Sequence, residues 1–432
     1  MNDYTSINKV VNADLCTNCG TCVSICPKNA VVMEINYMKG TYIPQIDSTL
    51  CTDCKMCINV CPGHNVDFKG LNNNIFGNEM EDNLVGNYRN IYVGHSKNSD
   101  IRYTSSSGGV ITQLLIYALE EGIINGALVT KMDNNHPLEP FPFIARTKKE
   151  IIESMGSKYC PVPLNIGLKE ILNAPDGQKF AIVGLPCHIH GIKKAEQIHK
   201  KLSNKIAFTV GIICSKCPNF LATEYLLGKL QTSKDNIKGI SYRGKGYPGG
   251  MTLSFIDGTH KFYHYWEYYD TCFGQFFSPT RCRLCIDFTS ELSDISCGDV
   301  FFDDECKTDQ SGSSVIISRN SIGEDLLKKA DSQITTRPID VSKFIEGCRR
   351  NIFFRKSCLS QRGKILNKKI PTFNSNPSLK LNFYSYVFLY VYRIGNNISN
   401  HKKYWFILKQ YGNLIGLLTI IYEKMNSKNK GD

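Results

Sequence analysis

The chain has 432 residues, 42% of them hydrophobic, with 19 cysteines and a formal net charge of +12. This length predicts two to four domains, and the 21% charged and 11% aromatic residues exclude a largely disordered chain. The odd and large number of cysteines argues against a disulfide framework and indicates metal ligands. Met1 leads into a polar segment without the apolar stretch of a secretory signal peptide, so we expect a cytoplasmic protein.

The positive charge belongs to the C-terminal part of the chain. Residues 346–432 hold 16 Lys or Arg and three Asp or Glu, whereas the preceding residues hold 35 and 36. We expect an α+β and α/β protein with five segments. These are a two-cluster ferredoxin-like domain (1–70), a linker (71–87), a mixed α/β body in two parts (88–165 and 166–345) and a basic, aromatic helical tail (346–432).

The first segment carries two copies of one cysteine motif. Residues 16–27 read CTNCGTCVSICP and residues 51–62 read CTDCKMCINVCP, which are both C-x2-C-x2-C-x3-C-P. This spacing is typical of two-cluster ferredoxins, in which the fourth cysteine of each motif binds the other cluster. Two zinc sites, which would use the same soft thiolates, are the alternative. The expected ligands are Cys16, Cys19, Cys22 and Cys61 for one 4Fe-4S cluster and Cys51, Cys54, Cys57 and Cys26 for the second.

The segment SSSGGVITQLLIYALEEGIINGALVT, residues 105–130, predicts a helix followed by a buried strand. Gly122 can end the helix, and Ile123 to Thr130 read as the strand. The small residues at the start leave the helix N-terminus accessible to an anion. An ordinary capped helix is the alternative interpretation.

Strands and helices then alternate. The segment KFAIVGLPCHIHGIKKAEQI runs from strand to helix with Cys187 at the turn, and KIAFTVGIICSKCPNFLATEYLLGKL repeats that order with Cys214 and Cys217 at its turn. This alternation predicts an α/β sheet with functional groups at the strand ends. The later segment ISYRGKGYPGGMTLSFIDGTHKFYHY predicts antiparallel strands that turn at Asp257-Gly258.

Seven motifs, in this order, carry a resemblance to a known family: SSSGGV (105–110), GSKY (156–159), GLPCHIHGI (184–192), GIIC (211–214), YRGKG (242–246), CRLCIDFTSELSDISCGD (282–299) and GSSVIISRN (312–320). With them the chain resembles the coenzyme F420 hydrogenase/dehydrogenase beta-subunit family. Together with the ferredoxin module, the resemblance covers about residues 1–345.

The resemblance implies a flavin-binding body. Members of that family bind FAD and pass electrons between iron–sulfur clusters and a reducible substrate, which is coenzyme F420 in the founding members. A flavin exchanges one or two electrons, so it joins one-electron clusters to a two-electron substrate. The resemblance suggests Ser106, Ser107, Gly108, Gly109, Arg243 and Lys245 as residues that hold FAD, and Lys158 and Tyr159 as residues of the flavin or substrate pocket. The alternatives are a helix cap for the serine–glycine segment, a hairpin turn for the Arg243/Lys245 loop and a surface lysine for Lys158.

The resemblance also implies a third 4Fe-4S cluster. Its expected ligands are Cys187, Cys214, Cys282 and Cys285, with Cys217 as a neighbour or substitute. Zinc and unligated structural thiols are the alternatives. The remaining cysteines are expected to be buried thiols: Cys160, Cys272, Cys297, Cys306, Cys348 and Cys358.

The tail alternates apolar or aromatic runs with lysines. Its longest uncharged runs, 381–392 and 410–422, are too short for a spanning helix, which needs about 18 residues. The runs suit helices that lie in a membrane interface, separated by Lys402, Lys403 and Lys409. A helical pair packed on the body is the alternative. Nucleic-acid binding is not expected, because no recognisable module accompanies the charge.

Taken together, the sequence predicts an oxidoreductase that moves electrons between ferredoxin-type clusters, FAD and an organic two-electron substrate. The substrate is coenzyme F420 or another acceptor, and a redox partner protein or a small-molecule acceptor is the expected partner. The alternative is a non-enzymatic electron-relay subunit of a larger complex. The expected location is the cytoplasm, with peripheral contact at the inner membrane face as the role of the tail.

Overall fold

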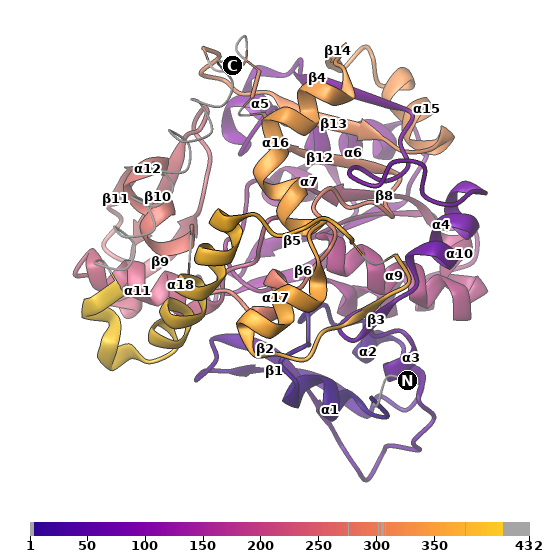
Figure 1. Cartoon of the computed structure of the whole chain (residues 1–432). Coiled ribbons are helices and arrows are strands. Elements are labelled where there is room, and N and C mark those ends of the chain that lie inside the picture. Colours follow the sequence, from indigo (N-terminus) through magenta and orange to yellow (C-terminus); the bar gives the residue numbers. More distant parts are fainter. Residues whose placement is uncertain are drawn as a thin grey trace, which may run out of the picture.

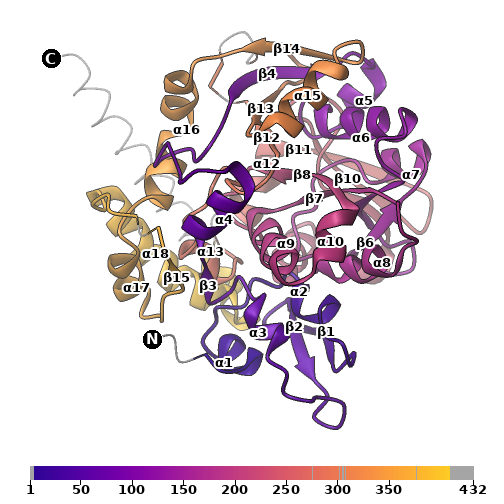
Figure 2. The same cartoon turned by 90° about the vertical axis from the view of Figure 1, so that its right-hand side faces the viewer.

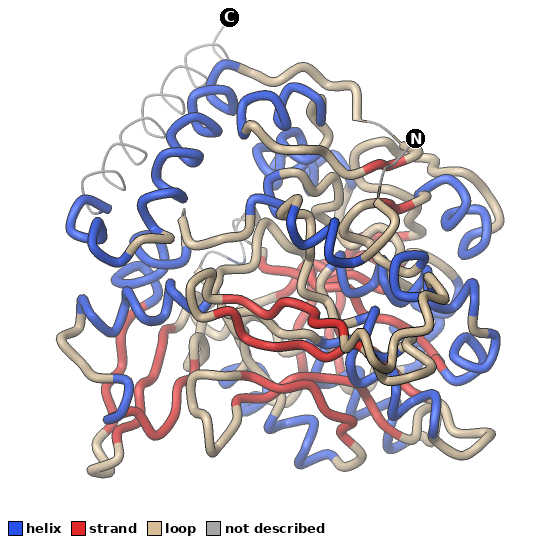
Figure 3. The backbone as a smooth tube through the Cα atoms, turned by 90° about the horizontal axis from the view of Figure 1, so that it is seen from below, coloured by secondary structure: helices blue, strands red, loops and turns tan. Residues whose placement is uncertain are grey.

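The computed structural model describes residues 4–408 except 275, 301, 304–305, 307 and 376. The N-terminal module lies beneath a larger α/β body, and the C-terminal helices lie across one side of that body (Figures 1 and 2). Seen from below, strands fill the middle of the molecule and helices surround them (Figure 3). The predicted mixed α/β class, with a separate N-terminal module, is confirmed.

The body is built on one eight-stranded mixed sheet, in the order β14-β4-β13-β12-β8-β7-β5-β6. Its strands are β4 (Asn90–Ser96), β5 (Gly126–Met132), β6 (Pro140–Ala145), β7 (Phe180–Gly184), β8 (Ile206–Ile212), β12 (Ile295–Asp299), β13 (Ser314–Ser318) and β14 (Ile334–Pro338).

Four central strands of this sheet are parallel, namely β5, β7, β8 and β12. The strands on either side of them pair antiparallel. Because the carboxyl ends of parallel strands meet at one edge of a sheet, the segments that follow β7, β8 and β12 come together there.

Alternate side chains of the parallel strands enter different cores, as the two-residue period of a strand requires. Ala127 and Val129 face one core, under helix α6, whereas Leu128 between them faces the other, under α9. Both faces are therefore covered, which explains why these strands read as nearly continuous apolar runs. The helices of the body are α5 (Ser99–Thr104), α6 (Val110–Glu120), α7 (Lys148–Glu153), α8 (Leu168–Asn173), α9 (Pro186–Ile198), α10 (Lys200–Lys205), α11 (Phe220–Lys229), α12 (Tyr265–Tyr268), α13 (Thr280–Arg283) and α15 (Ser321–Lys329).

A second, three-stranded antiparallel sheet stands beside the body (Figure 1). It consists of β9 (Ile237–Ser241), β10 (Gly250–Phe255) and β11 (His260–His264). The predicted hairpin between β10 and β11 is confirmed, with Gly258 at φ +85° and the Asp257 carboxylate accepting a hydrogen bond from the Thr259 amide at 2.9 Å.

The N-terminal module holds four short helices and two small sheets. The segment expected to be a linker, 71–87, begins inside helix α4, so that expectation was too broad. Asp67 caps this helix, Gly77 ends it at φ +78°, and Leu71 is buried in the core. The elements are α1 (Ile7–Asn12), α2 (Thr21–Ser24), β1 (Val31–Asn36), β2 (Thr41–Ile46), α3 (Met56–Asn59), β3 (Asn65–Val66) and α4 (Phe68–Phe76), with β15 (Thr372–Phe373) pairing to β3.

The C-terminal segment packs on the body through α16 (Val341–Arg355), α17 (Leu359–Leu366) and α18 (Phe383–Ser399). Leu389 and Tyr392 of α18 are buried in the core that the ferredoxin module and α9 share. No helix of the described residues is long and apolar enough to cross a membrane. The second apolar run of the tail, 410–422, and Lys409 lie outside the described residues.

Candidate functional site

The eight N-terminal cysteines fall into two sets, and each set lines its own small cavity. Cavities of about 20 and 50 Å³ are found at the two sets. Both cysteine loops turn through a left-handed residue, Gly20 at φ +82° and Lys55 at φ +63°, just before a short helix. The sets are Cys16, Cys19, Cys22 and Cys61, and Cys26, Cys51, Cys54 and Cys57. This is the crossed grouping that the motif predicts.

The donor chemistry of the first set fits a metal cluster. Burial, together with the charge of Cys61, raises the pKa of the Cys16 thiol to about 12. Burial and the charge of Cys19 raise the pKa of Cys61 to about 11. Thiols that are buried and repel one another as anions become thiolates when a bound cation compensates their charge. The backbone amide of Asn18 donates to Cys16 Sγ at 3.4 Å, and that of Ala30 donates to Cys26 Sγ at 3.3 Å.

The thiols of each set surround a space. Within residues 4–408, apart from the gaps given above, no three His, Cys, Asp or Glu side chains are grouped closely enough to hold one metal ion. Each of the two small cavities is lined by four cysteines, which is the number of thiolates that a 4Fe-4S cluster requires.

A larger cavity of about 290 Å³ lies at the carboxyl ends of the parallel strands. Cys187 reaches it from the N-terminus of α9, after β7, and Cys214 reaches it from the segment after β8. Burial and the neighbouring thiols, with Cys19 of the ferredoxin module first among them, raise the pKa of Cys187. The structure thus brings together all the cysteines expected at the third cluster, and the ferredoxin module adjoins them. The expected cysteines Cys187, Cys214, Cys217, Cys282 and Cys285 all line this cavity, and so do Cys16, Cys160 and Cys297.

The same cavity is lined by the small-residue segment before α6. Ser106 Oγ accepts the Ser157 amide at 2.8 Å, and Ser107 Oγ donates to the Ser313 carbonyl at 2.8 Å. A Cβ atom at Gly108 would meet the Gly94 carbonyl at 2.6 Å, so only glycine fits there. Gly109 caps α6 in the left-handed region at φ +73°. The first turn of an 11-residue helix therefore opens on the cavity.

Lys158 and Tyr159 lie close to this cavity in different ways. Lys158 lines it, but its ammonium donates to the carbonyls of Met155 at 3.1 Å and Gly156 at 3.0 Å, at the end of α7. Burial lowers the pKa of Lys158 to about 8. Tyr159 stands behind the cavity wall, where its ring packs against Tyr242 and other aromatic rings.

Arg243 and Lys245 lie outside the cavity lining. Arg243 is buried, stacks on Tyr265 at 4.9 Å and bonds Asp299 at 2.5 Å. Asp299, at the end of β12, does line the cavity, so Arg243 is linked to the cavity through its ion pair with Asp299. Lys245 is exposed and stands over the Phe262 ring at 5.6 Å.

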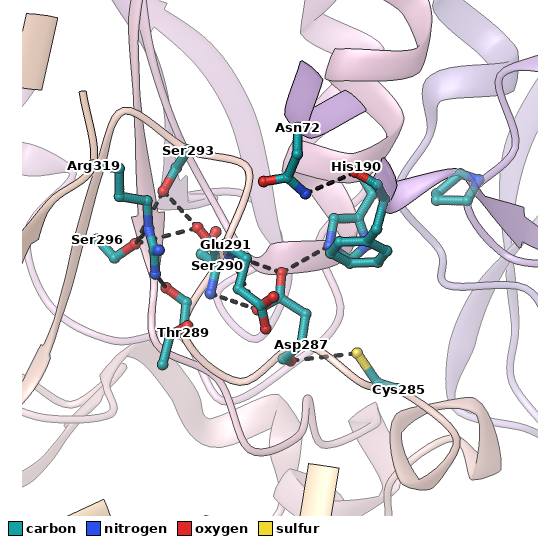
Figure 4. A network of polar contacts seen from close by, with 12 residues as sticks. Asn72, His190, Cys285, Asp287, Thr289, Ser290, Glu291, Ser293, Ser296 and Arg319 are labelled. Carbon is teal, nitrogen blue, oxygen red and sulfur yellow. Dashed lines mark hydrogen bonds and ion pairs between the residues drawn. The ribbon is translucent and has the colours of Figure 1, made fainter. Parts of the chain in front are cut away.

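A buried polar network supports the loop that carries Cys285 (Figure 4). Cys285 Sγ donates to the Asp287 carbonyl at 3.4 Å, and the Asp287 carboxylate pairs with His190 Nε2 at 2.8 Å. Asp287 also accepts the amides of Ser290 and Glu291. Asp287, His190 and Asp299 also line the cavity, although they are not among the predicted site residues. The only signal was their position inside the matching motifs, because no local spacing joins residues so far apart.

Comparison with known proteins places this chain in a family. The profile described as "Coenzyme F420 hydrogenase/dehydrogenase, beta subunit N-term" matches residues 91–169, and its C-terminal counterpart matches residues 177–342. A "4Fe-4S dicluster domain" matches residues 15–65. The chain therefore belongs to the coenzyme F420 hydrogenase/dehydrogenase beta-subunit family, preceded by a 4Fe-4S dicluster domain. It is an iron–sulfur electron-transfer protein.

Two relatives and one solved structure are similar to it. Coenzyme F420 hydrogenase subunit beta of Methanosarcina barkeri is 27% identical, over 61% of this chain and 87% of that protein. Coenzyme F420-dependent sulfite reductase of Methanocaldococcus jannaschii is 24% identical, over 74% of this chain and 46% of that protein. A chain of the F420-reducing NiFe hydrogenase complex from Methanosarcina barkeri shares the fold, with a TM-score of 0.52 at 23% identity over 67% of this chain and 98% of that chain.

Proposed function

We propose that this protein is an FAD- and iron–sulfur-dependent oxidoreductase that moves electrons between its clusters and an organic two-electron substrate. The substrate is coenzyme F420, after which the relatives are named, or another acceptor. The observation that carries the proposal is one cavity of about 290 Å³ that both the third group of cysteines and the serine–glycine segment line.

The proposed metal ligands form a series from the surface to this cavity. Cys51 and Cys54 are exposed, whereas Cys19 is buried against the body. From Cys19 a line of buried polar contacts leads to the third site. Cys19 Sγ contacts Thr21 Oγ1 at 3.2 Å, and Asn165 Nδ2 bonds both Thr21 Oγ1 at 2.8 Å and the carbonyl of His188 at 2.9 Å. His188 directly follows Cys187, so this contact line couples the first cluster to the third.

The chain's own residues would bind and shield the flavin. The first turn of α6 offers unpaired amides and the positive end of the helix dipole to a phosphate. Gly109, which lines the cavity, lets the backbone approach that group closely, and Gly108 lets the segment pack against β4. When bound, FAD supplies the exchange between one-electron and two-electron chemistry. Asp299, held by Arg243, lines the same cavity beside the serine–glycine segment, because it pairs in register with Ser314, whose hydroxyl contacts Ser107 Oγ at 2.9 Å. We propose that Asp299 orients the flavin or the substrate.

The alternative is a relay protein whose chemistry resides in a partner. Relatives named as subunits of a hydrogenase support a redox partner protein. Turnover separates the two proposals, since an isolated relay reduces its partner but no small acceptor. Anaerobic reduction of the purified chain, followed by a screen of acceptors that includes coenzyme F420, is the measurement.

Cofactor content tests the proposal itself. We expect about 12 iron atoms per chain, on the basis of three 4Fe-4S clusters, and one FAD after anaerobic reconstitution. Gly228→Ala provides the control for Gly108→Ala, because Gly228 lies inside helix α11 and no atom lies within 4 Å of a Cβ there. Protein that takes up iron but binds no FAD would contradict the flavin proposal.

We also propose that the C-terminal segment contacts an anionic membrane surface, which would place the protein peripherally at the inner face. Phe383, Tyr386, Tyr390 and Ile394 form an exposed stripe along α18, and the exposed Lys403 follows it. Such a pattern suits the interface of an anionic bilayer. Flotation with anionic but not zwitterionic vesicles is expected, and Tyr390→Ser together with Ile394→Ser should abolish it. Equal recovery with both kinds of vesicle, or none with either, would contradict this proposal.

A further inference from the structure

Two C-terminal helices, α16 and α17, cover the loop that carries Cys282 and Cys285. Apart from the first two residues of α16, they follow residue 342, where the match to the family profile ends. In Figures 1 and 2 they lie on the outside of the body, above the ferredoxin module. One arginine at the end of α16 and one on α17 donate hydrogen bonds to this loop, so the two helices also hold it in place.

Arg355 ends α16 and points its guanidinium into the third cysteine site. One terminal nitrogen donates to the carbonyls of Cys282 and Cys285, the latter at 3.3 Å, and the other donates to the carbonyl of Ser215. The side chain is buried and lines the large cavity. The guanidinium group of Arg355 therefore bridges two segments that supply cysteines, namely the segment after β8 and the segment that begins in α13.

Arg362, on α17, holds the same loop from behind. Its Nη1 atom donates to the carbonyls of Arg283 and Cys285, both at 2.9 Å. Its Nη2 atom donates to the carbonyls of Arg355 and Ser357 at 3.0 and 3.1 Å. The side chain is fully buried. Arg362 thus fixes both the cysteine loop and the backbone of Arg355.

We propose that Arg355 and Arg362 are positioning residues for the third cluster, which hold its Cys282–Cys285 loop and raise its reduction potential. This inference rests on the proposed function, because it takes these cysteines as cluster ligands. In the described residues, the hydrogen bonds of both guanidinium groups go to backbone carbonyls, and neither group pairs with a carboxylate. Two buried positive charges are thus left beside the cysteine site.

The sign of the effect follows from the charge. Reduction adds one negative charge to a cluster that is already anionic, and a fixed positive charge stabilises the reduced form more than the oxidised form. The Arg355 guanidinium lies beside the proposed ligands, because it lines the same cavity and donates to the carbonyls of Cys282 and Cys285. Loss of this arginine therefore lowers the reduction potential of the third cluster.

The test is an anaerobic redox titration of the full chain, followed by electron paramagnetic resonance, with Arg355→Gln, Arg355→Lys and Arg362→Gln. We expect Arg355→Gln to lower the reduced-to-oxidised ratio of the third cluster at least tenfold at a fixed potential, which is about 59 mV for one electron. Arg355→Lys, which keeps the charge but loses the fork, should shift the potential less but broaden the signal. Arg349→Gln, an exposed arginine on the same helix, is the matched control.

The signals of the two N-terminal clusters serve as an internal reference for folding. Arg362→Gln is expected to lower the iron content by about four atoms per chain while those two signals stay unchanged. Wild-type protein with only about eight iron atoms would overturn the third cluster, and with it the proposed function. Three clusters in every variant, with Arg355→Gln and Arg362→Gln indistinguishable from Arg349→Gln, would overturn the role of the arginines alone. Should Arg355→Gln not fold, Arg355→Lys and Arg362→Gln decide by the same two readouts.

Discussion

Lys356 and Glu291 form a buried ion pair. Loss of one partner should destabilise the packing of the C-terminal helices on the body. The Lys356 ammonium lies 2.6 Å from Glu291 Oε1, and the two side chains are 8% and 1% exposed. The second carboxylate oxygen has no hydrogen-bond partner among the described residues. At an effective dielectric constant of about 20, the attraction at this distance is about 6 kcal/mol. Desolvation of both charges offsets much of it, so the net worth of the pair is small.

Removing one partner is different, because the other charge stays buried alone. We therefore expect Lys356→Met to lower the free energy of unfolding by about 3–5 kcal/mol, and the double variant Glu291→Met, Lys356→Met to recover most of that loss. Lys364→Met, an exposed lysine on the next helix, is the control and should change it by less than about 0.5 kcal/mol. Anaerobic denaturant unfolding at matched iron content is the assay.

The loss of stability in Lys356→Met should depend on pH. Burial raises the pKa of Glu291 above the value of the unfolded chain, so its contribution to stability is lost as the pH rises through the folded pKa. Without Lys356 the folded pKa rises further above about 7, and the deficit of Lys356→Met should grow as the pH rises above about 7. A deficit independent of pH, or a double variant no more stable than the single one, would refute this reasoning.

Two further predictions concern the cavity and the acid stability of the body. Gly108→Ala should weaken FAD binding at least tenfold, measured by fluorescence titration of the apoprotein, because its Cβ would meet the Gly94 carbonyl and displace the serine–glycine segment that lines the cavity. Gly228→Ala, where no atom lies within 4 Å, should bind normally, and equal affinities would contradict the proposed role of this segment in binding FAD. Burial raises the pKa of Asp303, but hydrogen bonds from Lys343 and Arg337 outweigh it and hold this pKa at about 2. This contribution to stability is present above about pH 4 and lost as the pH falls towards 2. Asp303→Asn should therefore unfold with a flatter acid dependence than wild type, and an unchanged dependence would contradict the assignment.

The grouping of the N-terminal cysteines could be predicted from the sequence because most members of each set lie in one local motif. Three thiols within seven residues leave few ways to place them, and only the fourth comes from elsewhere in the chain. The grouping of Cys61 with the first motif followed from the crossed pattern alone. The alternation of strands and helices likewise predicted where Cys187 and Cys214 would stand, since both follow parallel strands.

Contacts between distant segments could not be predicted. Arg355 meets Cys282 across 73 residues, and no periodicity in either segment encodes that contact. For the same reason the positive charge of the C-terminal segment was read as a surface property, although Arg355, Lys356 and Arg362 are buried. The bonds of Lys158 to helix carbonyls depend on how the chain leaves α7, and a sequence motif does not specify that turn.

The transfer of electrons through the third cysteine site to the flavin is the central claim, and one kinetic measurement tests it directly. Reduced ferredoxin, a donor too large to enter the cavity, is mixed anaerobically with the FAD-loaded chain while flavin absorbance is followed. Wild type and Cys348→Ser, whose thiol lies in a separate core, should show rapid bleaching of the flavin. Cys187→Ser should reduce its N-terminal clusters yet bleach the flavin at least tenfold more slowly. Bleaching at the wild-type rate in Cys187→Ser would contradict the account.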